Sequence, residues 1–163
     1  MSKKNLFLNL LWVLLAAFSL TANGQSALKP FTSGSYQQLL ANNANKPFML
    51  VVWSVDCSSC LKEMALLSDI HKSNPNIKMI MLAADELSVN EKIEQILKQH
   101  QLDGIENWVF ADENSQKLRF EIDPKWYGEL PRTYFFDSAH QRTGKSGVMS
   151  KEDYQVMFVK IIK

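Results

Sequence analysis

The chain has 163 residues, of which 46% are hydrophobic and 21% are charged, and its formal net charge at pH 7 is +1. This length suits one globular domain with a sizeable core, and the near-neutral charge excludes the basic stripe that nucleic-acid binding requires. Two cysteines in the whole chain exclude a small scaffold that disulfides hold together.

The first 24 residues have the layout of a secretory signal. Two lysines precede a mostly apolar stretch, Leu6 to Leu20, and small and polar residues follow it. Ala22 and Gly24 fit the small positions before a cleavage site, so we expect the mature chain to begin near Gln25. The alternative is an uncleaved membrane anchor, although the apolar stretch is shorter than the ~20 residues that comfortably span a bilayer. Cleavage would remove two lysines and no acids, which changes the formal charge from +1 to −1.

Beyond this signal, we expect a flexible segment at 25–34 and then one domain at 35–163, in which strand and helix signals alternate. Short continuous apolar runs predict buried strands, and apolar residues at helical spacing predict amphipathic helices. The expected elements are a helix at 35–42, a strand at 48–53, a helix from 57 that ends at Asn74-Pro75, a strand at 77–84, a helix at 88–101, a strand at 108–112, a helix at 115–120, two strands within 132–149 joined by a polar hairpin at 137–142, and a helix at 150–163.

This order of elements predicts the fold class. Alternation of strand and helix favours parallel pairing, and the terminal hairpin followed by a helix adds an antiparallel edge. Ser150 is expected to cap the last helix, with Asp153 at the third position in place of the usual glutamate. The sequence therefore predicts an α/β fold with a central mixed sheet flanked by helices.

Cys57 and Cys60 stand three positions apart, between the strand that ends at Trp53 and the next helix. Zinc needs about four ligands, so the pair would be half a site, and the three histidines are scattered over different elements. A purely structural disulfide is a weak alternative, because closing so small a loop removes little entropy from the unfolded chain. At a helix start, free N–H groups and the helix dipole favour a Cys57 thiolate, and Cys60 can resolve a mixed disulfide.

At this point the chain resembles a known family. The stretch VVWSVDCSSCLKEM, the later GELPRTYFFD and the element order look like the thioredoxin superfamily, and most like its exported TlpA/ResA-type branch of thiol-disulfide oxidoreductases. The resemblance covers nearly all of residues 35–163. It implies a thioredoxin-like fold behind a signal segment, and a redox-active disulfide between Cys57 and Cys60 without a further cofactor.

The resemblance also implies roles for individual residues. Cys57 matches the attacking nucleophile and Cys60 the resolving thiol. Trp53 matches the family's tryptophan four positions before the first cysteine, with a plain core role as the alternative. Glu63 matches a glutamate near the active site of the TlpA/ResA branch, where it can influence thiol ionisation, and a solvated helix position is its alternative.

Pro131 matches the family's cis-proline, which faces the disulfide and, with Leu130 before it, exposes backbone to a substrate strand. An ordinary proline at a strand start is the alternative.

Asp56 departs from the family, which usually has an aromatic residue before the first cysteine. Its carboxylate should oppose the thiolate unless Asp56 is a simple helix cap. Ser59 replaces the usual proline, and Val51 replaces the buried acid of thioredoxins proper.

The favoured function is thiol-disulfide exchange, with the protein acting as a monomeric reductase that is exported, periplasmic in a bacterium. The resemblance implies a thiol-reducing membrane electron donor and clients that are exported disulfide proteins, such as apocytochrome c in cytochrome c biogenesis.

The alternative is a thioredoxin-fold copper chaperone or metal-site assembly factor that uses the same two thiols, because soft sulfur ligands select Cu(I). Methionines could assist such a site, although on strands and amphipathic helices they are more often core residues. Those considered are Met49, Met64, Met79 and Met81.

Overall fold

The computed structural model describes residues 28–162, so the expected signal segment lies outside the described residues. The strands are β1 (Lys29–Phe31), β2 (Phe48–Trp53), β3 (Lys78–Ala83), β4 (Glu106–Phe110), β5 (Arg132–Phe136) and β6 (Arg142–Ser146). The helical elements are α2 (Ser35–Asn42), α3 (Ser58–Ser73), the 3₁₀ turn η1 (Leu87–Val89), α4 (Asn90–Gln99), α5 (Ser115–Ile122) and α6 (Lys151–Ile161). Within 28–162, no helix has the length and apolar character needed to cross a bilayer.

The described part of the chain forms one mixed sheet in the order β1-β4-β3-β2-β5-β6. Strands β1 to β4 are parallel where they pair, while β5 is antiparallel to both β2 and β6. All six residues of β2 are buried, because helices cover both faces of the sheet at its centre. The expected α/β fold with a mixed, helix-flanked sheet is therefore confirmed.

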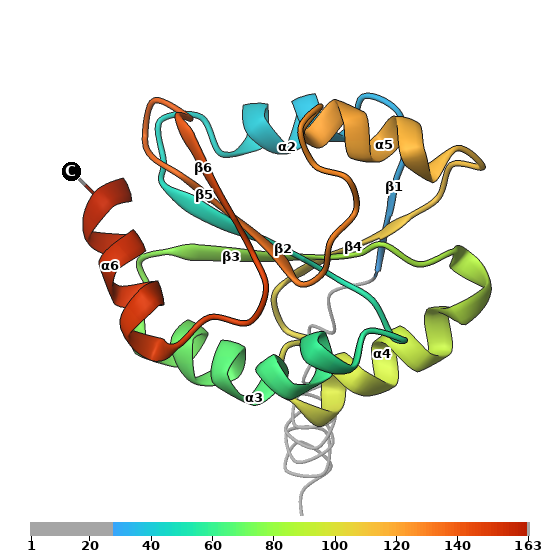
Figure 1. The fold of residues 1–163 in the computed structure, drawn as a ribbon, viewed down its shortest axis with the longest axis horizontal. Helices are drawn as coiled ribbons and strands as arrows, with labels where there is room; N and C mark the ends of the chain where they lie inside the picture. Colours follow the sequence, from blue (N-terminus) through green and yellow to red (C-terminus); the bar gives the residue numbers. More distant parts are fainter. Residues whose placement is uncertain (1–27, 163) are drawn as a thin grey trace, which may run out of the picture.

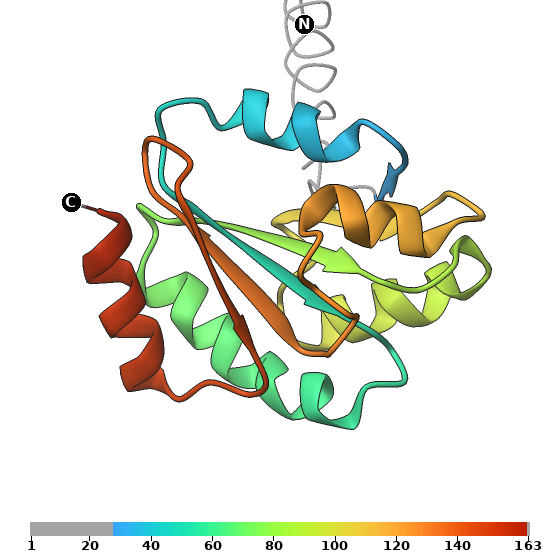
Figure 2. The ribbon, with the colours of Figure 1, turned by 45° about the horizontal axis from the view of Figure 1, so that its top comes forward.

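Two apolar clusters cover the two faces of the sheet. On one face α3, α4 and α6 pack against residues such as Met49, Val51 and Phe135. On the other face α2 and α5 pack against residues such as Leu50 and Tyr134. Figures 1 and 2 show these layers, with α2 and α5 on one side of the sheet and α3, α4 and α6 on the other. This alternation along each strand follows from the two-residue period of β structure.

The flexible segment expected at 25–34 is wrong for the residues that form β1. Lys29–Phe31 pairs in parallel with β4, with Phe31 fully buried and opposite Phe110. Lys29 also contacts Glu106 at 3.1 Å. Three residues with a central proline are too few to show an alternating pattern, so the strand forms because the open edge of β4 offers backbone partners and a pocket for Phe31.

The remaining elements lie close to their predicted positions. The helix expected from 88 begins as η1 and continues as α4, and β4 begins two residues earlier than expected, at Glu106. The predicted cap of α6 is confirmed. Ser150 Oγ accepts the N–H of Asp153 at 3.1 Å, and the Asp153 carboxylate accepts the N–H of Ser150 at 2.9 Å.

Candidate active site

The cysteine pair lies where β2 passes into α3. Cys57 is the N-cap of α3, and its Sγ accepts the N–H of Cys60 at 3.1 Å. The two cysteines form a disulfide. Cys60 is 1% exposed, whereas Cys57 is partly exposed. An incoming sulfur atom can therefore reach Cys57 but not Cys60, and the more accessible sulfur lies at the amino end of α3, where it accepts the N–H of Cys60.

Glu63 lies one turn after Cys60 on α3 and is buried, with 2% of its surface exposed. The solvated position considered from the sequence is therefore wrong. Its Oε1 accepts the N–H of Met149 at 2.9 Å and the hydroxyl of Tyr154 at 3.0 Å. Its Oε2 has no hydrogen-bond partner among the described residues. Burial raises the pKa of Glu63, and these two hydrogen bonds offset only part of that effect.

Asp56 is exposed and lies beside the disulfide. It does not cap α3, because Cys57 occupies that position. Instead its Oδ1 contacts Nζ of Lys92 on α4 at 2.9 Å. Lys92 therefore offsets part of the negative charge beside Cys57, a partner that the sequence does not indicate because 35 residues separate the two in the chain.

Pro131 follows a cis peptide bond with Leu130, as the resemblance implies. Val52 on β2 pairs with Arg132 on β5. Pro131 therefore lies at the end of the sheet where β2 finishes and the chain continues to Cys57. The carbonyl of Pro131 accepts the N–H of Gly147 at 2.9 Å. Leu130 packs against both apolar clusters. Trp53, 1% exposed, belongs to the core, so its site role stays a prediction.

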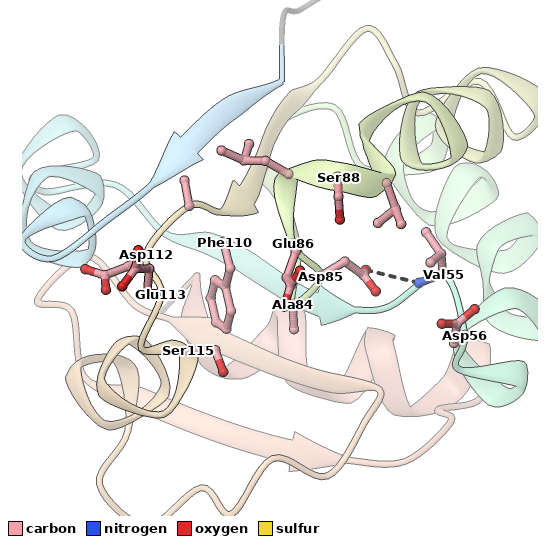
Figure 3. Close-up of a pocket in the computed structure, with 13 residues that line it drawn as sticks. Val55, Asp56, Ala84, Asp85, Glu86, Ser88, Phe110, Asp112, Glu113 and Ser115 are labelled. Carbon is pink, nitrogen blue, oxygen red and sulfur yellow. Dashed lines mark hydrogen bonds between the residues drawn. The ribbon is translucent and has the colours of Figure 1, made fainter.

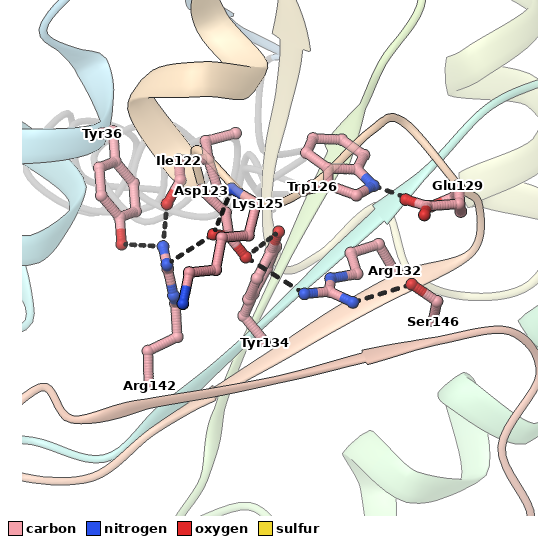
Figure 4. A network of polar contacts seen from close by, with 10 residues as sticks. All are labelled: Tyr36, Ile122, Asp123, Lys125, Trp126, Glu129, Arg132, Tyr134, Arg142 and Ser146. Atoms are coloured by element: carbon pink, nitrogen blue, oxygen red, sulfur yellow. Dashed lines mark hydrogen bonds and ion pairs between the residues drawn. The ribbon is translucent and has the colours of Figure 1, made fainter.

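A buried ion network that the sequence does not predict closes the loop that carries Leu130 and Pro131. Asp123, at the start of the loop, contacts Arg132 at 3.2 Å and Arg142 at 3.1 Å, and accepts the hydroxyl of Tyr134 at 3.2 Å (Figure 4). Burial alone would raise the pKa of Asp123, but the N–H of Lys125 and the two arginines outweigh it and hold the pKa below its usual value.

The network is completed by contacts at the ends of the two arginines. Arg142 donates to the hydroxyl of Tyr36 on α2 and to the carbonyl of Ile122 on α5, while Arg132 donates to Ser146 on β6. Both guanidinium groups lie over the ring of Tyr134, 4.7 and 5.1 Å from its centroid. Hydrogen bonds therefore connect the base of the cis-proline loop both to the helices α2 and α5 and to strand β6 of the sheet. Two arginines in otherwise strand-like segments are the only sequence signal for it.

A cleft of about 710 Å³ adjoins the segment between β2 and α3, of which Val55 and Asp56 line it. It lies at the carboxyl ends of β2, β3 and β4, and Figure 3 shows Asp85, Asp56 and Asp112 along it. Such ends of parallel strands are where α/β proteins commonly place binding sites. The sequence does not single out Asp85 or Asp112, because each stands alone after an apolar run.

Metal ligands do not gather in the described part of the chain, where no group of three or more His, Cys, Asp or Glu residues could hold an ion. The four methionines considered as copper ligands, Met49, Met64, Met79 and Met81, are all buried in the apolar cluster beneath α3. They belong to the same core cluster as Cys60, and Cys57 packs against that cluster.

No protein-family model and no curated protein matches the sequence. Several solved structures do match. A secreted Mycobacterium tuberculosis disulfide oxidoreductase homologous to E. coli DsbE is 19% identical, with 74% of this chain and 85% of that chain covered and a TM-score of 0.60. A thiol:disulfide interchange protein from Chlorobium tepidum is 15% identical, with 76% and 85% covered and a TM-score of 0.62. StoA from Bacillus subtilis is 15% identical, with 72% and 86% covered and a TM-score of 0.54. The chain therefore has the thioredoxin-like fold that its sequence predicts.

The exposure of the two cysteines generates a first prediction. In the reduced, folded protein, limited treatment with iodoacetamide should label Cys57 faster than Cys60 by about tenfold or more, because Cys60 is buried and Cys57 is not. Peptide mapping after a brief reaction measures the ratio, and labelling under denaturing conditions gives the control in which both thiols react. Preferential labelling of Cys60 would contradict the assignment of Cys57 as the nucleophile.

The burial of Glu63 generates a second prediction. Its pKa is raised in the fold, so the folded protein binds this proton more tightly than the unfolded chain. The free energy of unfolding therefore falls as pH rises from the ordinary glutamate pKa through the raised one. Glu63→Gln keeps an acceptor for Met149 and Tyr154 and removes this titration. Its stability relative to wild type should rise as pH increases above the ordinary glutamate pKa, as urea unfolding of the oxidised protein would measure.

Glu121 provides a control of opposite sign. The hydroxyl of Ser33 and the N–H of Gly34 lower the pKa of Glu121. Its contribution to stability is therefore present above the ordinary glutamate pKa and is lost as pH falls, so Glu121→Gln should lose stability relative to wild type as pH rises. A Glu63→Gln difference that stays constant over the same pH range would show that Glu63 does not titrate as its burial requires.

Proposed function

We propose that the protein is a thiol-disulfide oxidoreductase that reduces disulfides in exported proteins. The observation that carries this proposal is the Cys57–Cys60 disulfide at the amino end of α3, with Cys57 accessible and Cys60 buried. A nucleophile that a client can reach and a resolving thiol that it cannot reach are what directional exchange requires. The fold shared with a secreted disulfide oxidoreductase and a thiol:disulfide interchange protein supports the same chemistry.

In the proposed reaction, the Cys57 thiolate attacks one sulfur of a client disulfide. A mixed disulfide forms, and the other client sulfur leaves as a thiolate that takes up a proton. Cys60, once deprotonated, attacks Cys57 Sγ, which releases the second client thiolate and forms the Cys57–Cys60 disulfide. Two electrons thus pass to the client, and a thiol-reducing membrane partner must return them before the next cycle.

Glu63 and the cis-proline loop have supporting roles in this proposal. Glu63 is one turn from Cys60 on the same helix, and as a buried carboxyl with a raised pKa it influences ionisation of the thiols. In this proposal the backbone next to the cis Leu130–Pro131 bond, at the end of β5 that pairs with the carboxyl end of β2, receives an extended client segment. We place the monomeric protein outside the cytoplasm, in the periplasm of a bacterium, with apocytochrome c as one candidate client.

Reduction of insulin tests the activity directly. The protein should accelerate precipitation of insulin chains in the presence of dithiothreitol, and the Cys57→Ser, Cys60→Ser double variant should not. A parallel measurement of bound Cu(I) with bathocuproine tests the copper chaperone. Stoichiometric copper without insulin reduction would replace the enzyme by that alternative.

The division of roles between the cysteines gives a third prediction. Cys60→Ser removes the resolving attack but leaves nucleophilic attack intact, so it should accumulate mixed disulfides with clients through Cys57. Non-reducing electrophoresis of cell envelopes, followed by reduction, measures them. The matched variant Cys57→Ser should trap several-fold less, because its remaining thiol is buried. Equal trapping by both variants would contradict the proposed order of attack.

The Asp56–Lys92 pair gives a fourth prediction, about the reduction potential. Removal of the Asp56 carboxylate should favour the Cys57 thiolate and so stabilise the reduced state. Asp56→Asn should therefore raise the potential, by about 5 to 20 mV for a group so exposed. Lys92→Gln leaves Asp56 without its partner and should lower the potential by a similar amount. Equilibration with glutathione measures both, and shifts of the same sign would deny Asp56 a tuning role.

A further inference from the structure

We propose that Asp85 is a positioning residue for the cysteine pair. Its carboxylate holds the segment between β2 and α3 so that Cys57 lies at the helix start in the reduced protein. This inference rests on the thiol-disulfide exchange proposed above and adds a residue to its machinery that lies outside the CxxC motif and the cis-proline loop.

The contacts of Asp85 converge on the residues just before Cys57. Its Oδ1 accepts the hydroxyl of Ser54 at 2.8 Å, and its Oδ2 accepts the N–H of Val55 at 3.1 Å (Figure 3 draws the second bond). The oxygen of Ser54 in turn accepts the N–H of Asp56 at 3.2 Å. The N–H of Cys57 donates to the carbonyl of Ser54 at 3.2 Å. One carboxylate is therefore connected to all three residues of the segment 54–56.

The sheet explains why a residue after β3 can do this. Trp53 and Ala83 are paired at the ends of the parallel strands β2 and β3, and the N–H of Ala84 donates to the carbonyl of Trp53 at 2.8 Å. The segments that follow β2 and β3 therefore leave the sheet side by side. A carboxylate two residues beyond the end of β3 then meets the segment that leads to Cys57, and it offers separate oxygens to one O–H and one N–H donor.

The tether matters most when the disulfide is open. In the oxidised protein the bond to Cys60 restrains Cys57 covalently. After reduction, the segment is still restrained by the buried side chain of Val55, by the exposed ion pair of Asp56 with Lys92 and by the bonds to Asp85. If these bonds keep Cys57 Sγ at the N–H of Cys60, they favour its thiolate, and loss of them should make the thiol less acidic.

Two Asp85 variants separate position from charge. Asp85→Asn loses the charge but can still accept from Val55 through its oxygen and donate to the Ser54 oxygen through its amide. Asp85→Ala loses both the charge and the contacts. Loss of a nearby negative charge by itself would make Cys57 more acidic, which is opposite to the effect of lost positioning. Glu86→Ala is the matched control, because Glu86 is the next carboxylate along the same cleft and no hydrogen bond joins it to segment 54–56 among the described residues.

Other charged groups near the pair stay unchanged in these variants. They are Asp56 with its partner Lys92 on α4, and Glu63 behind Cys60 on α3, which Met149 and Tyr154 contact. Any change in the ionisation of Cys57 therefore reports on Asp85 and its bonds.

The experiment is the pH dependence of iodoacetamide labelling of Cys57 in the reduced, full-length protein. In Asp85→Ala the apparent pKa of Cys57 should rise and the rate at neutral pH should fall by about tenfold, the size expected for one lost hydrogen bond to a charged group. Asp85→Asn and Glu86→Ala should stay within about twofold of wild type. Circular dichroism of each oxidised variant confirms its fold, and Ser54→Ala should show a smaller shift in the same direction as Asp85→Ala, which decides the matter if Asp85→Ala does not fold.

A wild-type pH profile in Asp85→Ala would overturn the inference. So would a lowered Cys57 pKa in both Asp85→Ala and Asp85→Asn, since loss of charge alone would then explain it. An equal rise in both variants would also overturn it, because Asp85→Asn keeps the two bonds, and so would a rise in Glu86→Ala equal to that in Asp85→Ala. The labelling reaction uses no client, so its result is separate from the proposed function. Failure of the wild-type protein to reduce insulin would count against that function, whereas an unaltered Cys57 in Asp85→Ala counts against the role of Asp85.

Discussion

The parallel pairing of β2 with β3 is the constraint on which the site depends. It brings the buried carboxyl ends of the two strands to the same edge of the sheet, with Trp53 opposite Ala83. From one end the chain turns into α3 with Cys57 as its cap, and from the other it presents Asp85. If β2 shifted by one residue in this register, all its side chains would move to the opposite face of the sheet. The apolar clusters on the two faces therefore also hold the site in place.

Three carboxylates near the cysteine pair differ in surroundings and therefore in effect. Glu63 is buried on the same helix as Cys60, and burial raises its pKa above that of an ordinary glutamate. Asp56 is exposed and faces Lys92, so solvent and the ammonium weaken its field at Cys57. Both carboxylate oxygens of Asp85 accept hydrogen bonds from the segment 54–56. Residue type alone would not distinguish these three roles.

The second half of the site is held from the opposite face of the sheet. The ion network around Asp123 closes the loop from α5 to β5, and it includes Arg132, the residue directly after Pro131. Ion pairs of this kind contribute little net stability, but loss of one partner is costly, because it leaves a largely buried charge uncompensated. Leu130 packs against both apolar clusters and β5 pairs with β2, so the loop that carries Pro131 is held from both faces of the sheet.

The sequence by itself determined the fold class, the order of the elements and the place of the cysteine pair, because apolar periodicity, helix caps and a CxxC after a buried strand are local patterns. β1 was missed because three residues gain strand structure only from the open edge of β4. The burial of Glu63, the pairing of Asp56 with Lys92 and the bonds of Asp85 to Ser54 and Val55 were decided by tertiary structure alone. Each joins residues tens of positions apart, and whether a carboxylate is solvated, paired or buried depends on what the packing of other elements places against it.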